Sequence, residues 1–134
     1  MTNTFQLEIV TPSRLLVKDA AEEAQIPGLS GYLGILPGHA PLLTELGVGA
    51  ITYKANGASH TLSLAWGLAE VLPDKVTILA EAAERPQEID VERAQKAKDR
   101  AAERLKSNDP QVDYARAEDA LQRAETRLNI AKDK

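Results

Sequence analysis

Apolar and polar residues alternate through much of the first 86 residues of the chain. Residues 5–9 show this period of two, which is the pattern of a half-buried β-strand. Apolar residues also alternate within residues 51–53 and 60–64, and these two runs flank the pair Asn56-Gly57. Because Asn-Gly is the strongest short-range signal of a tight hairpin turn, we predict a β-hairpin centred on this pair.

Two further strands are predicted at residues 68–72 and 76–80, separated by a Pro73-Asp74 turn. Short strands at regular spacing, with turn signals between them, are typical of a small antiparallel β-sandwich or barrel. We therefore assign residues 1–86 to such a domain. Trp66 is expected to contribute a large side chain to its core.

The apolar period becomes helical after residue 87. Two stripes at helical spacing follow, Ala94, Ala97, Ala101 and Leu105 on the first and Ala117, Leu121, Ala124 and Leu128 on the second. Between them, Asp109 is expected to cap the second helix and Pro110 to occupy its first position. Residues 87–134 are thus predicted to form an antiparallel two-helix hairpin, which makes the fold class α+β.

The predicted seam of this hairpin consists mainly of alanine. Alanine buries little apolar surface, at about 0.8 kcal/mol per methylene-sized group, and isolated helices of this length are marginal in water. We infer that the hairpin is weakly held and able to rearrange. A permanently docked hairpin is the alternative.

Charge separates the same two parts. Residues 1–86 contain 5 basic and 9 acidic side chains, whereas residues 87–134 contain 11 of each, which gives a net charge of −4. This acidic balance argues against nucleic acid as a partner. The chain has no cysteine and no apolar run near the roughly 18 residues that a membrane span needs, so any membrane contact is expected to be indirect.

Candidate catalytic groups are few. His39 and His60 are the only histidines, so we predict no metal site. A hydrolytic triad of Ser63, His60 and Asp74 lacks a nucleophile-elbow motif around the serine. We therefore predict that the chain has no catalytic residues and requires no cofactor.

Residues 31–43, with the sequence GYLGILPGHAPLL, combine three glycines and two prolines with several apolar side chains. The glycines permit positive φ and the prolines fix their own φ, so we interpret the segment as a rigid apolar loop and a docking surface. Leu33, Ile35 and Leu36 are its expected apolar anchors. Tyr32 is expected either at an interface or in simple packing, and His39 either contacts a partner or satisfies loop carbonyl groups.

The sequence closely resembles the epsilon subunits of bacterial proton-translocating rotary ATP synthases. The likeness rests on residues 31–43, on Ile9-Val10-Thr11-Pro12, on KVTILA at residues 75–80 and on IDVERA at residues 89–94. The resemblance implies that the sandwich docks the gamma subunit and the c-ring. The implied interface residues are Gly31, Tyr32, Leu33, Gly34, Leu36 and His39.

The IDVERA segment also resembles a pattern that marks a regulatory ATP site in this family. On local physics alone, Asp90 is an N-cap, Ile89 a staple residue and Arg93 a solvated first-turn charge. The resemblance instead implies an ATP site made of Glu84, Ile89, Asp90, Arg93, Ala94, Arg100, Arg123 and Arg127. Guanidinium groups suit phosphate oxygens, which agrees with the basic members of this set.

The family likeness implies a non-catalytic subunit on the cytoplasmic face of the bacterial membrane, within the ATP synthase complex. Its sandwich would help to couple rotation to ATP synthesis, and its hairpin would inhibit ATP hydrolysis when extended toward the catalytic alpha and beta subunits. ATP is the expected regulatory ligand that favours the folded hairpin. A stand-alone ATP-sensing module and a purely structural adaptor are the two alternatives.

Overall fold

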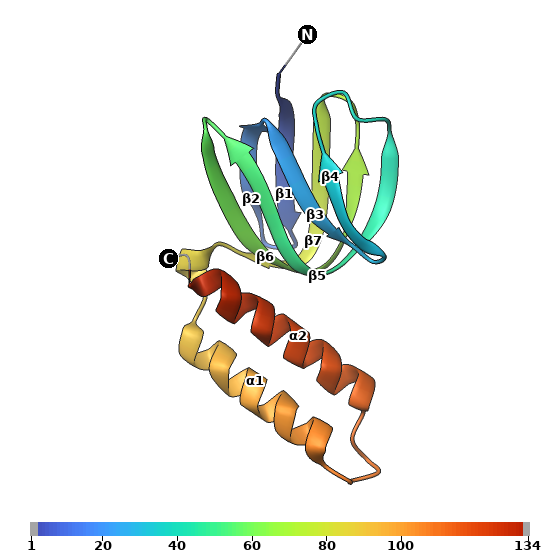
Figure 1. Ribbon diagram of the computed structural model, residues 1–134, viewed down its shortest axis with the longest axis vertical. Helices are drawn as coiled ribbons and strands as arrows, with labels where there is room; N and C mark the ends of the chain where they lie inside the picture. Colours follow the sequence, from blue (N-terminus) through green and yellow to red (C-terminus); the bar gives the residue numbers. More distant parts are fainter. Residues whose placement is uncertain (1–2, 133–134) are drawn as a thin grey trace.

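The computed structural model describes residues 3–132, which form a β domain followed by two helices (Figure 1). The elements are β1 (Phe5–Thr11), β2 (Arg14–Ala21), β3 (Glu23–Gly28), β4 (Gly31–Ile35), β5 (Leu42–Ala55), β6 (Ala58–Val71), β7 (Lys75–Glu84), the 3-10 turn η1 (Pro86–Glu88), α1 (Val91–Lys106) and α2 (Tyr114–Ala131). The predicted fold class, an α+β chain with a sandwich and a helical hairpin, is confirmed.

The seven strands form one sheet in the order β2-β1-β7-β6-β5-β3-β4. Five of its six pairings are antiparallel, and the pairing of β1 with β7 is parallel. The sheet curls so that β2, at one edge, reaches β5, and the Tyr53 hydroxyl on β5 donates a hydrogen bond of 2.6 Å to Asp19 on β2. Buried apolar side chains from all seven strands fill the space that the curled sheet encloses.

Strands β5 and β6 form the predicted hairpin. Asn56 has a φ of 54° and Gly57 a φ of 75°, and the flanking residues Ala55 and Ala58 are paired. Positive φ at both turn residues matches the tight hairpin turn that Asn-Gly favours. The segments 60–64 and 68–72, which we predicted as separate strands, belong to the single long strand β6, which ends one residue earlier than predicted, at Val71.

Trp66 is not a core residue, so that prediction is wrong. Leu62 and Leu64 point into the core, and continued alternation would place Trp66 there as well. Trp66 instead has a φ of 61°, and its side chain is 38% exposed. Beyond it the buried positions change to Ala69 and Val71, so the left-handed residue reverses which face of β6 is buried.

The two helices pack along the predicted alanine seam. Ala94 and Ala101 of α1 and Ala117 and Ala124 of α2 are buried, which confirms both stripes. The Asp90 side chain accepts a hydrogen bond of 3.0 Å from the backbone N–H of Arg93, so Asp90 is the N-cap of α1 as expected.

The second helix begins later than predicted. Its N-cap is Asp113, whose side chain accepts a hydrogen bond from the backbone N–H of Arg116. Asp109 instead accepts a hydrogen bond of 2.9 Å from the Gln111 N–H within the turn that precedes the helix. Aspartate is a favoured N-cap residue at either position, and α2 begins after Asp113.

The hairpin lies against one end of the β domain, with α2 on the side of β5 and β6 (Figure 1). Ile89, Ile130 and Ala131 form a small buried apolar cluster that packs on Ala50 of β5. The Gln122 side chain also donates a hydrogen bond of 3.4 Å to the Val48 carbonyl. The apolar part of this contact is therefore small compared with the core of the sandwich.

We expect Tyr53 to ionise at a higher pH than an ordinary tyrosine. Burial raises the pKa of Tyr53 to about 12, and the hydrogen bond to the Asp19 carboxylate acts in the same direction, against a smaller lowering by Arg85. An ultraviolet absorbance titration should show this late step in the wild type and in Tyr114→Phe. The step should vanish in Tyr53→Phe, and a late step that persists in that variant would contradict the assignment.

The same shift fixes how stability changes at alkaline pH. The unfolded chain loses this phenolic proton near its ordinary pKa of 10.0, whereas the fold holds it to about 12. The contribution of Tyr53 to the free energy of unfolding is therefore complete below pH 10 and declines between pH 10 and 12.

Candidate functional site

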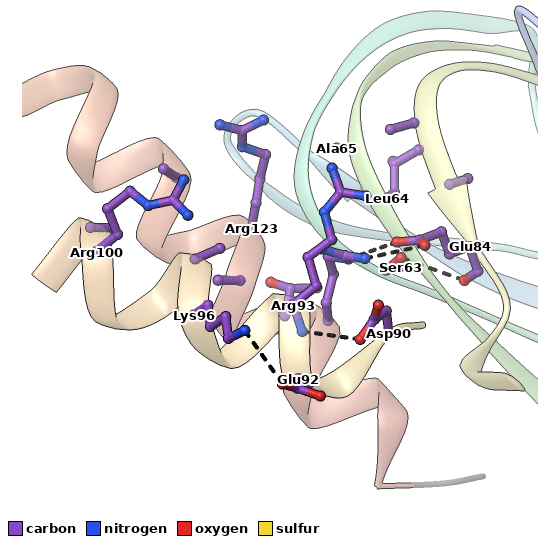
Figure 2. Close-up of a pocket in the computed structure, with 18 of the residues that line it drawn as sticks. Ser63, Leu64, Ala65, Glu84, Asp90, Glu92, Arg93, Lys96, Arg100 and Arg123 are labelled. Atoms are coloured by element: carbon purple, nitrogen blue, oxygen red, sulfur yellow. Dashed lines mark hydrogen bonds and ion pairs between the residues drawn. The ribbon is translucent and has the colours of Figure 1, made fainter. Parts of the chain in front are cut away.

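A cavity of about 600 Å³ lies between the hairpin and the ends of β6 and β7 (Figure 2). Its sheet wall is built from Ser63, Leu64, Ala65, Ala82, Ala83 and Glu84. Its helical wall carries charged side chains from both α1 and α2. The cavity therefore exists only because the hairpin is docked on the sandwich.

Glu84 and Arg127 join the two walls. Arg127 on α2 donates from Nε to Glu84 Oε1 at 2.7 Å and from Nη2 to Oε2 at 3.3 Å. Glu84 is the last residue of β7, and its strand partner on β6 is Ser63. Bidentate pairs between arginine and a carboxylate are among the stronger polar contacts in proteins, and both side chains of this pair are half-buried.

Asp90 and Arg93 lie at the start of α1, at the end of the cavity nearest Glu84 (Figure 2). The Asp90 carboxylate accepts a hydrogen bond from the Arg93 backbone N–H, so Asp90 caps the helix and also lines the cavity. Arg93 belongs to the cavity through its side chain and to the cap through its backbone.

Positive charge dominates the cavity. Among residues 3–132, seven basic side chains line it, namely Arg93, Lys96, Arg100, Arg104, Arg116, Arg123 and Arg127. In the same part of the chain three carboxylates line it, and each is already engaged: Glu84 by Arg127, Glu92 by Lys96 and Asp90 by the helix cap.

Arg123 is paired with Asp119, which is not among the residues that line the cavity. Within residues 3–132, no ion pair neutralises the guanidinium groups of Arg93, Arg100, Arg104 and Arg116. An anion with several oxygens is the ligand that suits such a site.

Six of the eight predicted ATP-site residues line the cavity, and two do not. Glu84, Asp90, Arg93, Arg100, Arg123 and Arg127 are in its wall. Ile89 is 2% exposed in the cluster with Ile130, and Ala94 is fully buried on α1. The structure thus places these two residues behind the site, where they support its walls.

The sequence reasoning missed several lining residues. The charged ones are Glu92, Lys96, Arg104 and Arg116, and a spacing signal existed for the two arginines. Arg93, Arg100 and Arg104 are separated by seven and four residues, as are Arg116, Arg123 and Arg127, so each set shares one helical face. Ser63, Leu64 and Ala65 come from a distant strand, and no local signal marks them.

Other candidate chemistry is not assembled. Among residues 3–132, no group of three metal-ligating side chains occurs. The Ser63 hydroxyl donates to the Glu84 carbonyl at 3.5 Å, and the His60 ring stacks on Tyr53, so neither side chain is placed in a triad with Asp74. None of the described helices is long and apolar enough to cross a membrane.

The predicted docking segment is a strand followed by a turn. Its first part is β4, an edge strand of the sheet, in which Ile35 is buried in the core and Leu33 is partly buried against it. Leu36 is 60% exposed just beyond the strand, so of the three expected anchors it is the one that lies on the surface. Gly31 and Gly38 adopt positive φ, and Gly34 does not.

Tyr32 and His39 both serve the fold locally. The Tyr32 hydroxyl accepts a hydrogen bond of 3.0 Å from the Ala50 N–H, although the side chain remains 53% exposed. The His39 Nδ1 lies 2.6 Å from the Ala40 carbonyl oxygen, which agrees with the loop-carbonyl interpretation.

Two family models match the chain. Residues 4–86 match the model described as ATP synthase, Delta/Epsilon chain, beta-sandwich domain, and residues 87–132 match the model of the long alpha-helix domain of the same chain. The chain belongs to the ATP synthase delta/epsilon chain family. The predicted family is therefore confirmed.

Relatives in this family are similar over most of their length. An ATP synthase epsilon chain from Koribacter versatilis is 67% identical over 111 residues, which cover 83% of this chain and 78% of that protein. An ATP synthase epsilon chain from Nitratidesulfovibrio vulgaris is 47% identical over 130 residues, or 97% of each chain.

A solved structure shares the fold of this family member. A chain of the Euglena gracilis mitochondrial ATP synthase, in an assembly of OSCP, F1 and c-ring, superimposes with a TM-score of 0.82 at 23% identity. The match covers 94% of this chain and 80% of that one.

Proposed function

We propose that this chain is a non-catalytic central-stalk subunit of a bacterial proton-driven ATP synthase, with a β-sandwich that docks the complex and a mobile hairpin that senses ATP. The sandwich, residues 1–86, would bind the gamma subunit and the c-ring at the cytoplasmic face of the membrane. The hairpin, residues 87–134, would regulate ATP hydrolysis by the alpha and beta subunits.

The docking part of the proposal is supported by the names of the relatives and by the surface of the sandwich. The curated relatives are epsilon chains of ATP synthase, and the Euglena neighbour belongs to an assembly that contains F1 and the c-ring. Leu36, Leu42 and Leu43 are exposed close together in sequence. Exposed apolar side chains of this kind favour a partner surface.

The sensing part is supported by one observation above all, the group of unpaired guanidiniums around a cavity that lies between the sheet and the hairpin. A nucleoside triphosphate would supply the several anionic oxygens that these guanidiniums can bind. The unpaired Arg93 and Arg100 would bind it from α1. On α2, Arg123 and Arg127 would also bind it, and each would share its guanidinium between the ligand and its present carboxylate partner. Because these residues lie on different helices and face the sheet, the ligand would hold the hairpin in its docked position.

The energies make such control feasible. A ligand that binds one state alone, at about ten times its dissociation constant, stabilises that state by about 1.4 kcal/mol. Between residues 3 and 132, the contacts that hold the docked hairpin on the sandwich include a bidentate ion pair, a long hydrogen bond and a small apolar cluster. A shift of this size is therefore enough to change the majority population of a weakly docked hairpin.

The first prediction concerns removal of the hairpin. Deleting residues 88–134 should leave a folded sandwich, because the sheet encloses its own apolar core. Circular dichroism of the fragment should retain the β signal, and a complex rebuilt with it should still couple ATP synthesis while hydrolysing ATP faster. Loss of assembly or of coupling would show that the hairpin is structural.

The second prediction tests the docking surface. Leu36→Asp should weaken assembly with the gamma subunit and the c-ring while leaving the isolated fold intact, because the Leu36 side chain is mostly solvent-exposed. Ala58→Asp, at an exposed position at the start of β6, is the matched control and should assemble normally. If Leu36→Asp loses its circular dichroism signal, the residue serves the core and the docking argument fails.

The third prediction tests the ATP site. Arg93→Ala should weaken ATP binding and remove the ATP-dependent docking of the hairpin, with the strand domain still folded. Calorimetry would measure binding, and fluorophores on the sandwich and on α2 would report docking. Lys98→Ala, on α1 but outside the cavity wall, is the control. An unchanged distance in the wild type at millimolar ATP, despite measurable binding, would refute the switch.

A further inference from the structure

The segment that joins the sheet to the hairpin is a closed turn. Within η1 the Glu88 N–H donates to the Arg85 carbonyl at 3.0 Å, and the Glu88 side chain accepts from the Arg85 N–H at 2.8 Å. The Ile89 N–H donates to the Pro86 carbonyl at 3.3 Å. These reciprocal bonds make residues 85–88 a compact unit.

This turn is also attached to strand β2, about seventy residues earlier in the chain. The Arg85 guanidinium donates a hydrogen bond of 2.9 Å to the Leu16 carbonyl, and the Arg14 guanidinium pairs with the second carboxylate oxygen of Glu88. Glu88 therefore uses one oxygen inside the turn and the other toward β2. Partial burial opposes ionisation, but the Arg85 N–H and the Arg14 guanidinium outweigh it and keep the pKa of Glu88 below its ordinary value.

The backbone changes conformation after Glu88. Ile89 and Asp90 have extended backbones, with φ, ψ of −75°, 124° and −82°, 99°, and they separate η1 from α1. The Asp90 side chain caps its own helix. Ile89 packs with Ile130 and Ala131 of the hairpin, and this cluster contacts Ala50 of β5 while the hairpin is docked.

We propose that Arg14, Arg85 and Glu88 form a clamp that keeps η1 on β2 when the hairpin undocks, so that the hairpin pivots at Ile89–Asp90. The pivot thus lies beyond η1 and not at the end of β7. This inference rests on the proposed mobility of the hairpin and deepens it. Two extended residues between a clamped turn and a capped helix allow φ and ψ to change without unwinding either element.

The absence of cysteine makes a distance measurement direct. Spin labels on Lys18→Cys and Gln87→Cys report the gap between β2 and η1, and labels on Lys18→Cys and Glu125→Cys report the position of the hairpin. All three side chains are exposed. In the full chain, Arg127→Glu should undock the hairpin because it places a second negative charge beside Glu84.

In the undocked chain we expect the 18–125 distances to broaden and the 18–87 distances to stay narrow. Adding Glu88→Gln should then broaden the 18–87 distances, because the charge partner of Arg14 is lost. Arg14→Gln should do the same from the opposite element, which guards against a local effect on the turn. Glu92→Gln, which breaks the Glu92–Lys96 pair just beyond the pivot, is the matched control and should leave them narrow.

The outcomes separate the clamp from the proposed function. If the 18–87 distances broaden while Glu88 and Arg14 are intact, the pivot lies before η1 and the clamp is overturned. If they stay narrow in both Glu88→Gln and Arg14→Gln, the ion pair is not what holds η1, which also overturns it. If Arg127→Glu leaves the 18–125 distances unchanged, the hairpin is permanently docked, and the proposed mobility fails together with the pivot.

Discussion

The arrangement of the two parts depends on the ion pair between Glu84 and Arg127. It joins the last residue of the sheet to the second helix, and the cavity lies beside it. Little apolar surface reinforces it, because the cluster around Ile89 is small. A polar contact of this kind is weakened by salt and by competing charges.

The sequence predicted the parts of the fold that local patterns specify. The alternation in β1, the Asn56-Gly57 turn and the two alanine stripes are all consequences of a fixed period, and all are present. The predictions failed where a tertiary constraint overrides the period. The left-handed conformation of Trp66 reverses the buried face of β6, and the parallel pairing of β1 with β7 joins strands that are distant in sequence.

The candidate site shows the same limit. The resemblance identified Glu84, Asp90 and four of the helical arginines. Arg104 and Arg116 were missed, although their spacing of four and seven residues from the predicted arginines places them on the same helical faces. Ser63 could not be found, since it reaches the cavity only through its pairing with Glu84 across two strands. Ile89 was assigned to the ligand by its place in a motif, whereas its side chain is used to bury the end of α2.

The alanine seam has a further geometrical consequence. Small side chains let the two helices lie close together, and the same small side chains make the pair easy to separate. At 1.5 Å per residue, α1 and α2 are about 24 Å and about 27 Å long. Laid end to end they would span about 50 Å, so unfolding the hairpin at its turn would roughly double the reach of this part of the chain without breaking either helix.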